Sequence, residues 1–287
     1  MQILSDTGMD LSLEQMAGLD IHLVPLVITL DDKSYRSGVD IQPDEFYQLL
    51  TATDSLPITS QPSAGDLAEF YRQLAATDPE ILSIHISSGL SGTVNAAKAA
   101  IELVPEANVT IVDTKTLSGA EGWQVEAAAR AVKAGWSKEQ VLLLVERVSA
   151  VTDTIFTLSD LTYLIHGGRI SHMKGLIASV LNIKPIIGVE KEGGTYAQRG
   201  QARTFKGAVR KLVDLVARQH APGSRLRVQV MHAQNPEGAT MMRELFDQRF
   251  DCTFLPLSPI APVLGAHTGP SLVGVAYASL ADFPELP

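Results

Sequence analysis

Cysteine is almost absent from this chain of 287 residues, which contains only Cys252. One cysteine cannot form an internal disulfide, and this composition suits a reducing compartment. Long hydrophobic runs are also missing: residues 24–30 and 180–187 are the longest candidates, and a membrane span needs about 20 apolar residues. No basic segment followed by an apolar one opens the sequence, so we expect no signal peptide. These features predict a cytoplasmic protein.

Positive charge is scarce as well. The sequence has 23 Lys and Arg against 32 Asp and Glu, a net charge of −9. Nucleic acid is therefore not expected as a partner, because phosphate neutralisation needs a basic face. The His, Asp and Glu residues show no spacing typical of metal ligands, and the glycine-rich P-loop of nucleotide-binding proteins is missing. We expect neither a metal nor a cofactor.

Hydrophobic residues make up 45% of the chain, enough for a substantial core. The first half alternates strand-like and helix-like segments. Strands are predicted over residues 21–30, 81–86 and 109–112, and helices over residues 44–53, 63–77, 94–104, 122–133 and 138–149. This alternation favours a Rossmann-like, mainly parallel sheet covered by helices, in an N-terminal α/β domain of residues 1–150.

The second half has a different pattern. Strands are predicted over residues 154–158, 184–189 and 226–231, and helices over residues 176–181 and 204–219. The turn Gly193-Gly194 indicates a hairpin, which requires antiparallel pairing. We therefore predict an α+β domain with a mixed or antiparallel sheet over residues 151–287.

Two hydroxyl-rich segments precede predicted helices. Residues 87–93 (Ser-Ser-Gly-Leu-Ser-Gly-Thr) point backbone N–H groups toward one spot, with Ser91 near its centre, and so form a candidate anion site. Residues 58–63 contain Thr59 and form a second cluster, and both clusters could instead serve only as helix caps. If both follow strands of one parallel sheet, they converge at its carboxyl edge.

Further candidates lie in the second half. Arg169 follows Gly167-Gly168, where the backbone can approach a ligand closely, and His267 lies among small residues. Either residue could also be purely structural. A predicted helix places the four basic residues Arg199, Arg203, Lys206 and Arg210 on one face. This stripe is either a solvated face or a surface for an acidic partner or anionic lipid.

Taken together, these segments resemble the DegV family, the fatty-acid-binding subunits of bacterial fatty acid kinase. The likeness runs nearly from end to end and rests on motifs whose order and spacing match. They lie at residues 5–11, 24–26, 59–63, 87–93, 167–171, 183–186 and 267–270. Three positions depart from the family pattern, namely Gly8, His166 and Ser271. None of them removes a head-group residue, and Ser271 is expected to tighten the loop that carries His267.

The resemblance implies one long-chain fatty acid buried in a tunnel between the two domains of a DegV fold. It implies that Thr59, Ser91 and His267 hold the carboxylate, and that Arg169 and Arg203 belong to the head-group end and the partner surface. It also implies a non-catalytic subunit that presents the carboxylate to a separate ATP-dependent kinase, which forms an acyl phosphate. Transient contact with a membrane is compatible with this role.

Two alternatives belong to other classes of protein. Ser91 as nucleophile and His267 as base would make a hydrolase or acyltransferase. That mechanism needs an acidic group to orient His267, and the Gly-x-Ser-x-Gly elbow of many hydrolases is incomplete because Thr93 replaces its last glycine. A phosphosugar-binding module is the second alternative, and it would retain phosphate but no lipid.

Overall fold

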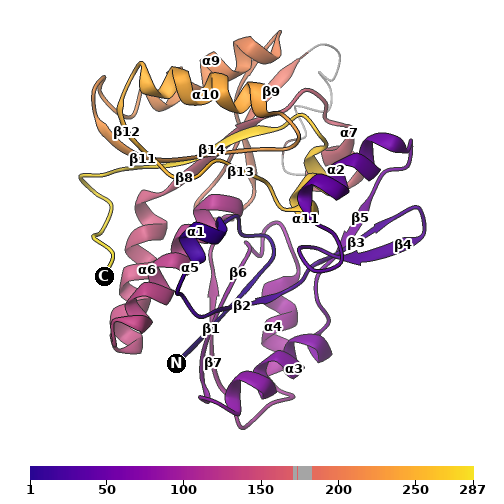
Figure 1. The fold of residues 1–287 in the computed structure, drawn as a ribbon, viewed down its shortest axis with the longest axis vertical. Helices are drawn as coiled ribbons and strands as arrows, with labels where there is room; N and C mark the ends of the chain where they lie inside the picture. The colour runs from indigo at the N-terminus through magenta and orange to yellow at the C-terminus, as the bar shows by residue number, and fades with distance from the viewer. Residues whose placement is uncertain (171–172, 174–182) are drawn as a thin grey trace.

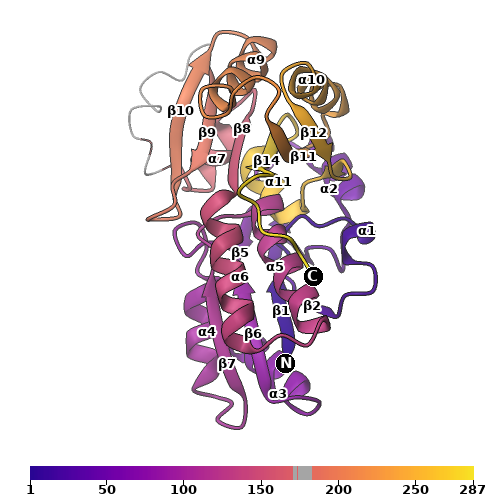
Figure 2. The ribbon, with the colours of Figure 1, turned by 90° about the vertical axis from the view of Figure 1, so that its left-hand side faces the viewer.

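The computed structural model describes residues 1–170, 173 and 183–287. Two main sheets lie at opposite ends of the molecule, the first at the bottom and the second at the top of Figure 1. Figure 2 shows the helices packed on both sides of the first sheet. The predicted fold class, with a parallel sheet followed by a separate mixed sheet, is confirmed.

The first sheet is parallel throughout. Its strands are ordered β2 (Ile21–Val24), β1 (Gln2–Asp6), β6 (Glu80–His85) and β7 (Asn108–Asp113). Alternate side chains face opposite ways along a strand: Leu4 packs in one buried cluster with helices α3 (Ala64–Ala75) and α4 (Thr93–Ile101). Ile3 packs in another cluster with α5 (Ser118–Lys133) and α6 (Lys138–Val151). Both faces of the sheet are therefore buried.

Residues 21–30 do not form the single strand that the sequence predicts. Pro25 has no N–H for a strand ladder, and the next residue, Leu26, donates its N–H to Thr7 Oγ1 at 3.0 Å. The chain thus leaves the first sheet after β2. Strand β3 (Val27–Leu30) joins a small antiparallel sheet with β4 (Lys33–Arg36) and β5 (Ile58–Ser60), which sequence analysis did not predict.

The second sheet is mixed. Its strands are ordered β10 (Tyr196–Ala202), β9 (Lys184–Val189), β8 (Asp153–Thr157), β14 (Val273–Ser279), β11 (Arg225–His232) and β12 (Asp251–Phe254), and β13 (Ser258–Pro259) also pairs with β11. Pairings are antiparallel except those of β11 with β12 and β13. The predicted β9–β10 hairpin is confirmed. The predicted helix at residues 176–181 lies outside the described residues.

The predicted basic stripe on one helix face was wrong. Helix α9 (Phe205–Val216) begins after Thr204, whose side chain accepts the N–H of Gly207 and so caps the helix. Arg199 lies earlier, on strand β10, because β10 stays paired with β9 as far as Ala202. Arg203 is exposed in the bend between the two elements.

Helix α11 (Pro262–Thr268) joins the two halves of the chain. It packs against α2 (Pro43–Ala52), β3 and β5 from the first half and against α7 (Thr162–His166) from the second. Helix α1 (Leu13–Met16) lies near the same junction (Figure 1). Helix α10 (Pro236–Asp247) covers the second sheet beside α9.

A buried glutamine also connects the halves. Gln229 on β11 accepts a hydrogen bond from Trp123 Nε1 of α5 at 2.7 Å and donates one to the Asp10 carbonyl at 3.0 Å. Both Trp123 and Gln229 are fully buried. A buried polar group without a hydrogen-bond partner destabilises the folded state, so Gln229 contributes to the stability of the contact between the two halves.

We expect Gln229→Ala to lower the free energy of unfolding by about 3 kcal/mol, because it leaves the Trp123 N–H and the Asp10 carbonyl without partners. Urea denaturation followed by Trp fluorescence measures the change. Gln248→Ala, at an exposed position after α10, is the matched control and should change stability by less than about 0.5 kcal/mol. Equal effects of the two variants would contradict the role given to Gln229.

Candidate functional site

Four of the five predicted site residues line one cavity between the two halves of the chain. The cavity is narrow, with a volume of about 30 Å³. Its polar lining comes from Thr59, Ser91, Arg169 and His267, and its apolar lining from Leu26, Ile86, Leu90, Leu117, Tyr196, Val263 and Leu264. The predicted convergence of the two hydroxyl clusters therefore occurs, although Thr59 lies on β5 of the small sheet and not at the edge of the parallel sheet.

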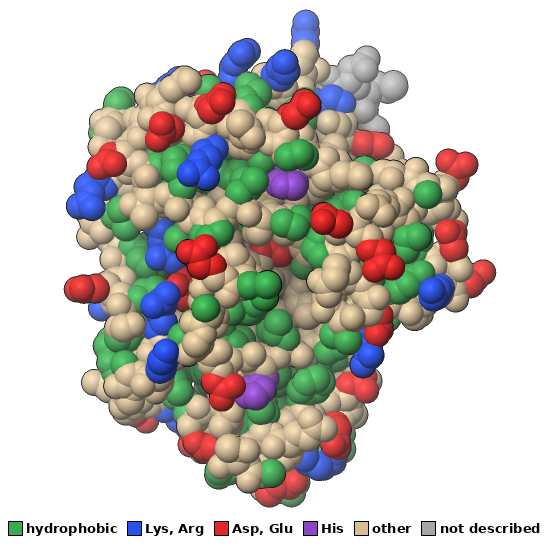
Figure 3. Space-filling model, viewed as in Figure 1, with side chains coloured by type: hydrophobic (Ala, Val, Ile, Leu, Met, Phe, Trp, Pro, Cys, Tyr) green, Lys and Arg blue, Asp and Glu red, His purple; other side chains and the backbone are tan. Residues whose placement is uncertain are grey.

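A second cavity adjoins the first and is almost entirely apolar. Its volume is also about 30 Å³, and it is lined by Leu117, Ser118, Thr154, Phe156, Tyr196, Met231, Ile260, Leu264, Thr268, Leu272 and Gly274. Leu117, Tyr196 and Leu264 line both cavities. One side of the molecule is visibly hollowed between its upper and lower parts, with hydrophobic side chains around the hollow (Figure 3). The site therefore has a polar end and an apolar continuation.

His267 is held at the polar end by the small sheet. Its Nε2 lies 2.7 Å from Thr59 Oγ1, and its Nδ1 has no hydrogen-bond partner among the described residues. Burial, together with the smaller effects of nearby Arg169 and His166, lowers the pKa of His267 to about 3. The imidazole is therefore neutral at physiological pH, with one ring nitrogen as donor and the other as acceptor.

Gly167, two residues before Arg169, makes room for this imidazole. A Cβ atom at Gly167 would lie only 2.1 Å from His267 Nδ1, so no other residue fits there without displacing the ring. Arg169 then donates from Nε to the Leu90 carbonyl at 3.1 Å and from Nη1 to the Gly167 carbonyl at 2.6 Å. Arg169 thus ties the turn beside His267 to the loop that carries Ser91.

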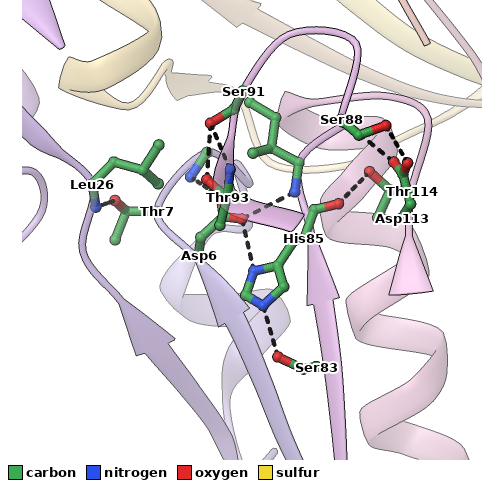
Figure 4. A network of polar contacts seen from close by, with 12 residues as sticks. Asp6, Thr7, Leu26, Ser83, His85, Ser88, Ser91, Thr93, Asp113 and Thr114 are labelled. Carbon is green, nitrogen blue, oxygen red and sulfur yellow. Dashed lines mark hydrogen bonds and ion pairs between the residues drawn. The ribbon is translucent and has the colours of Figure 1, made fainter. Parts of the chain in front are cut away.

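The Ser91 loop is fixed from both sides. The Ser91 hydroxyl lies 2.8 Å from Thr93 Oγ1, at the start of α4 (Figure 4). Ser87 Oγ donates to the Gly194 carbonyl of the β9–β10 turn at 2.8 Å. A Cβ at Gly89 would lie 2.4 Å from the Gly193 carbonyl, which explains the glycine there. Ser91 has no hydrogen bond to His267 in the described structure, so the pair required by the hydrolase alternative is not formed.

Sequence analysis missed the buried network behind this loop. His85 Nδ1 donates to Asp6 Oδ2 at 3.0 Å, and the Ser83 hydroxyl bonds His85 Nε2 at 2.7 Å (Figure 4). Asp6 also accepts the N–H groups of Gly8 and Ile86. The order Ser–His–Asp is that of a catalytic triad, but Asp6, Ser83 and His85 are 0% exposed. The network therefore supports the loop and cannot meet a substrate.

Two other positions singled out in the sequence lie around this site. Ser271 accepts the N–H of Ser159 at 2.9 Å, which connects the loop that follows α11 to the end of β8. Arg203 does not line either cavity. Across residues 1–170, 173 and 183–287, no cluster of three or more His, Cys, Asp or Glu is placed to hold a metal ion. No helix within these residues is long and apolar enough to cross a membrane.

These features define an α/β protein with an amphipathic cavity between its two main sheets. Residues 1–280 match the family model described as "Uncharacterised protein, DegV family". A DegV domain-containing protein of Staphylococcus aureus is 33% identical over 95% of this chain and 96% of its own length. One from Deinococcus radiodurans is 34% identical over 90% and 89%, respectively. The chain belongs to the DegV family.

Solved structures agree with this assignment. A DegV lipid-binding protein of Thermotoga maritima is 29% identical, with a TM-score of 0.86, over 97% of this chain and 98% of its own. DegV of Bacillus subtilis, described as a fatty-acid-binding protein, is 28% identical with a TM-score of 0.86 over the same shares. A DegV family protein of Thermus thermophilus, described by its fatty acid binding, is 29% identical with a TM-score of 0.86, over 97% of this chain and 99% of its own.

The low pKa of His267 predicts a pH dependence of stability. The ordinary pKa is 6.5 and the folded value is about 3, so between these values the unfolded chain binds a proton that the folded protein does not. Stability is therefore lost as the pH falls from 6.5 toward 3. NMR of the His267 Cε1–H group should show no titration above about pH 4. The variant His267→Gln identifies the NMR signal of His267 and should make stability depend less on pH. A titration midpoint near pH 6.5 for this signal would contradict a buried, neutral imidazole.

Proposed function

We propose that this protein binds one long-chain fatty acid, with its carboxylate at Thr59, Ser91 and His267 and its chain in the apolar cavity. The observation that carries the proposal is that the polar cavity and the apolar cavity lie side by side and share the lining residues Leu117, Tyr196 and Leu264. A polar end with hydroxyl donors and a long apolar continuation matches the amphipathic shape of a fatty acid. No metal or cofactor takes part in the proposed binding.

The energetics suit this ligand. A chain of about fourteen methylenes gains roughly 0.8 kcal/mol for each one buried, or about 10 kcal/mol before the costs of association. The carboxylate opposes entry because an unpaired charge in an apolar cavity is very unfavourable. The hydroxyl groups of Thr59 and Ser91 offset this cost by donating to the carboxylate, and His267 supports Thr59 by donating its one ring N–H to the Thr59 hydroxyl oxygen. The acyl chain thus supplies affinity and the polar end supplies orientation.

We further propose that the protein is not itself the catalyst, and that a separate ATP-dependent kinase phosphorylates the bound carboxylate. A general base works best with a pKa near the operating pH, and the pKa of His267, about 3, is far below it. The described Ser91 hydroxyl bonds Thr93 and not this ring. Both observations favour binding over the hydrolase alternative. Arg169 lies at the head-group end, and the exposed Arg203 is our candidate for the docking surface.

Head-group binding is tested with Thr59→Val and Ser91→Ala. Each should weaken binding of palmitate about ten- to a hundredfold, because a hydrogen bond to a charged group is worth about 1.5–3 kcal/mol. Hexadecanol carries no charge, so the affinity for hexadecanol should fall much less than the affinity for palmitate. Competition with a fluorescent fatty acid measures both affinities, and Ser60→Ala, at an exposed neighbour of Thr59 on β5, is the control. Equal losses for acid and alcohol would mean that the two hydroxyls serve only the fold.

Docking is tested with Arg203→Glu in an assay with a bacterial fatty acid kinase. We expect a higher apparent KM for this protein and an unchanged content of bound fatty acid, since complementary charge mainly promotes association. The difference should shrink at high salt. Arg210→Glu, at an exposed position on α9, carries the same charge change away from the bend. Phosphorylation of Arg203→Glu at the wild-type rate in low salt would remove Arg203 from the docking surface.

A further inference from the structure

Arg199 occupies an irregular position in strand β10. Gln198 pairs with Ile187, but Gly200 pairs with Ile186, so Arg199 is an extra residue between them. Such a β-bulge turns a side chain away from its regular direction, and bulges occur frequently beside functional sites. The bulge therefore gives Arg199 an orientation that an unbroken hairpin would not.

The neighbouring strand is shaped to receive this arginine. A Cβ atom at Gly188 of β9 would lie 2.9 Å from Arg199 Nε, so the glycine leaves the space that the guanidinium occupies. Arg199 Nη2 donates to the Val189 carbonyl at 3.2 Å. The guanidinium is thus held against β9 by a bulge, a glycine and a hydrogen bond.

A cavity of about 280 Å³ lies beside this guanidinium. It is lined by Asp153, Thr154, Ile155, Val189, Arg199, Leu215, Arg218, Gln219 and Tyr277. Arg218 follows the end of α9 and supplies a second guanidinium. Tyr277 is buried and donates its hydroxyl hydrogen to Gln219 Oε1 at 3.0 Å, so the floor of the cavity is ordered.

The charge of this cavity is opposite to that of the whole protein. Two guanidiniums, from Arg199 and Arg218, outnumber the single carboxylate of Asp153, which also faces Lys191 Nζ at 3.6 Å. The chain as a whole carries −9. A concave site with this local excess of positive charge attracts anions.

This cavity is separate from the proposed lipid site. Thr154 and Phe156 line the apolar cavity, whereas Asp153 and Ile155, which alternate with them along β8, line the cavity beside Arg199. Alternate residues of a strand face opposite sides of a sheet. Thr154 lines both cavities, so β8 forms the wall between them.

We propose that the cavity beside Arg199 and Arg218 binds the phosphate group of a small, hydroxyl-bearing phosphate monoester. Guanidinium groups bind phosphate oxygens through paired N–H donors, and two of them suit an anion with more than one negative charge. Asp153 and Gln219 can accept hydrogen bonds from hydroxyl groups of the same ligand. The ligand is therefore polar, unlike the occupant of the apolar cavity.

Isothermal titration of the full chain with ribose 5-phosphate tests the site, with ribose and inorganic phosphate as reference ligands. We expect saturable binding of one ribose 5-phosphate per chain, weaker binding of phosphate and none of ribose. Arg218→Gln and Arg199→Gln should each weaken binding about tenfold or more. Arg210 is an exposed arginine of α9 that does not line the cavity, so Arg210→Gln should bind as the wild type does.

Bound lipid is measured in the same samples and should be equal in all variants, because the two sites lie on opposite sides of β8. Absence of saturable binding of both phosphate ligands would overturn the proposal. So would an affinity of Arg218→Gln equal to that of Arg210→Gln. Equal affinities for phosphate and ribose 5-phosphate would contradict the proposal that the site recognises the hydroxyl groups of its ligand, and the cavity would then be a site for simple anions.

Discussion

The hydrogen bond between Thr59 and His267 joins residues 208 positions apart, and the arrangement of the whole site follows from it. His267 lies near the end of α11, and Thr59 lies on the small sheet formed after the chain leaves the first sheet at Pro25. The start of α11 is fixed as well, because Asp10 accepts the Ala261 N–H at 2.8 Å. The helix that carries the imidazole is therefore held by the first half of the chain at both ends.

Burial of polar groups is the physical cost of this arrangement. Burial raises the pKa of Asp10 to about 7, although hydrogen bonds from Ser118 and Ala261 oppose the rise. It also raises the pKa of Glu121 far above its ordinary value, and the nearby carboxyl groups of Asp6 and Asp10 add to this rise. The Asp10 carboxyl accepts hydrogen bonds from the Ser118 hydroxyl and the Ala261 N–H, whereas neither carboxyl oxygen of Glu121 has a partner among the described residues.

Local signals predicted much of the fold. The predicted helix over residues 63–77 begins at a capping box of Ser63 and Asp66, and Gly193-Gly194 marks the hairpin, because both features depend only on neighbouring residues. The bulge at Arg199 and the buried pair of Asp6 and His85 were not predictable, since each depends on a strand that is remote or paired out of register. The sequence motifs pointed to the polar residues that line the cavity. The motifs did not predict that Thr59 reaches the cavity from the small sheet, because that sheet forms only when Pro25 divides one predicted strand into two.

The central claim is that the cavity between the two sheets holds an acyl chain. Native mass spectrometry of the protein purified from a bacterial host, followed by organic extraction and lipid analysis, tests this claim most directly. The account predicts one fatty acid of about C14 to C18 per chain, the length at which buried methylenes contribute about 10 kcal/mol. A folded protein whose native mass equals that of the bare chain, and whose extract contains no acyl species, would contradict it.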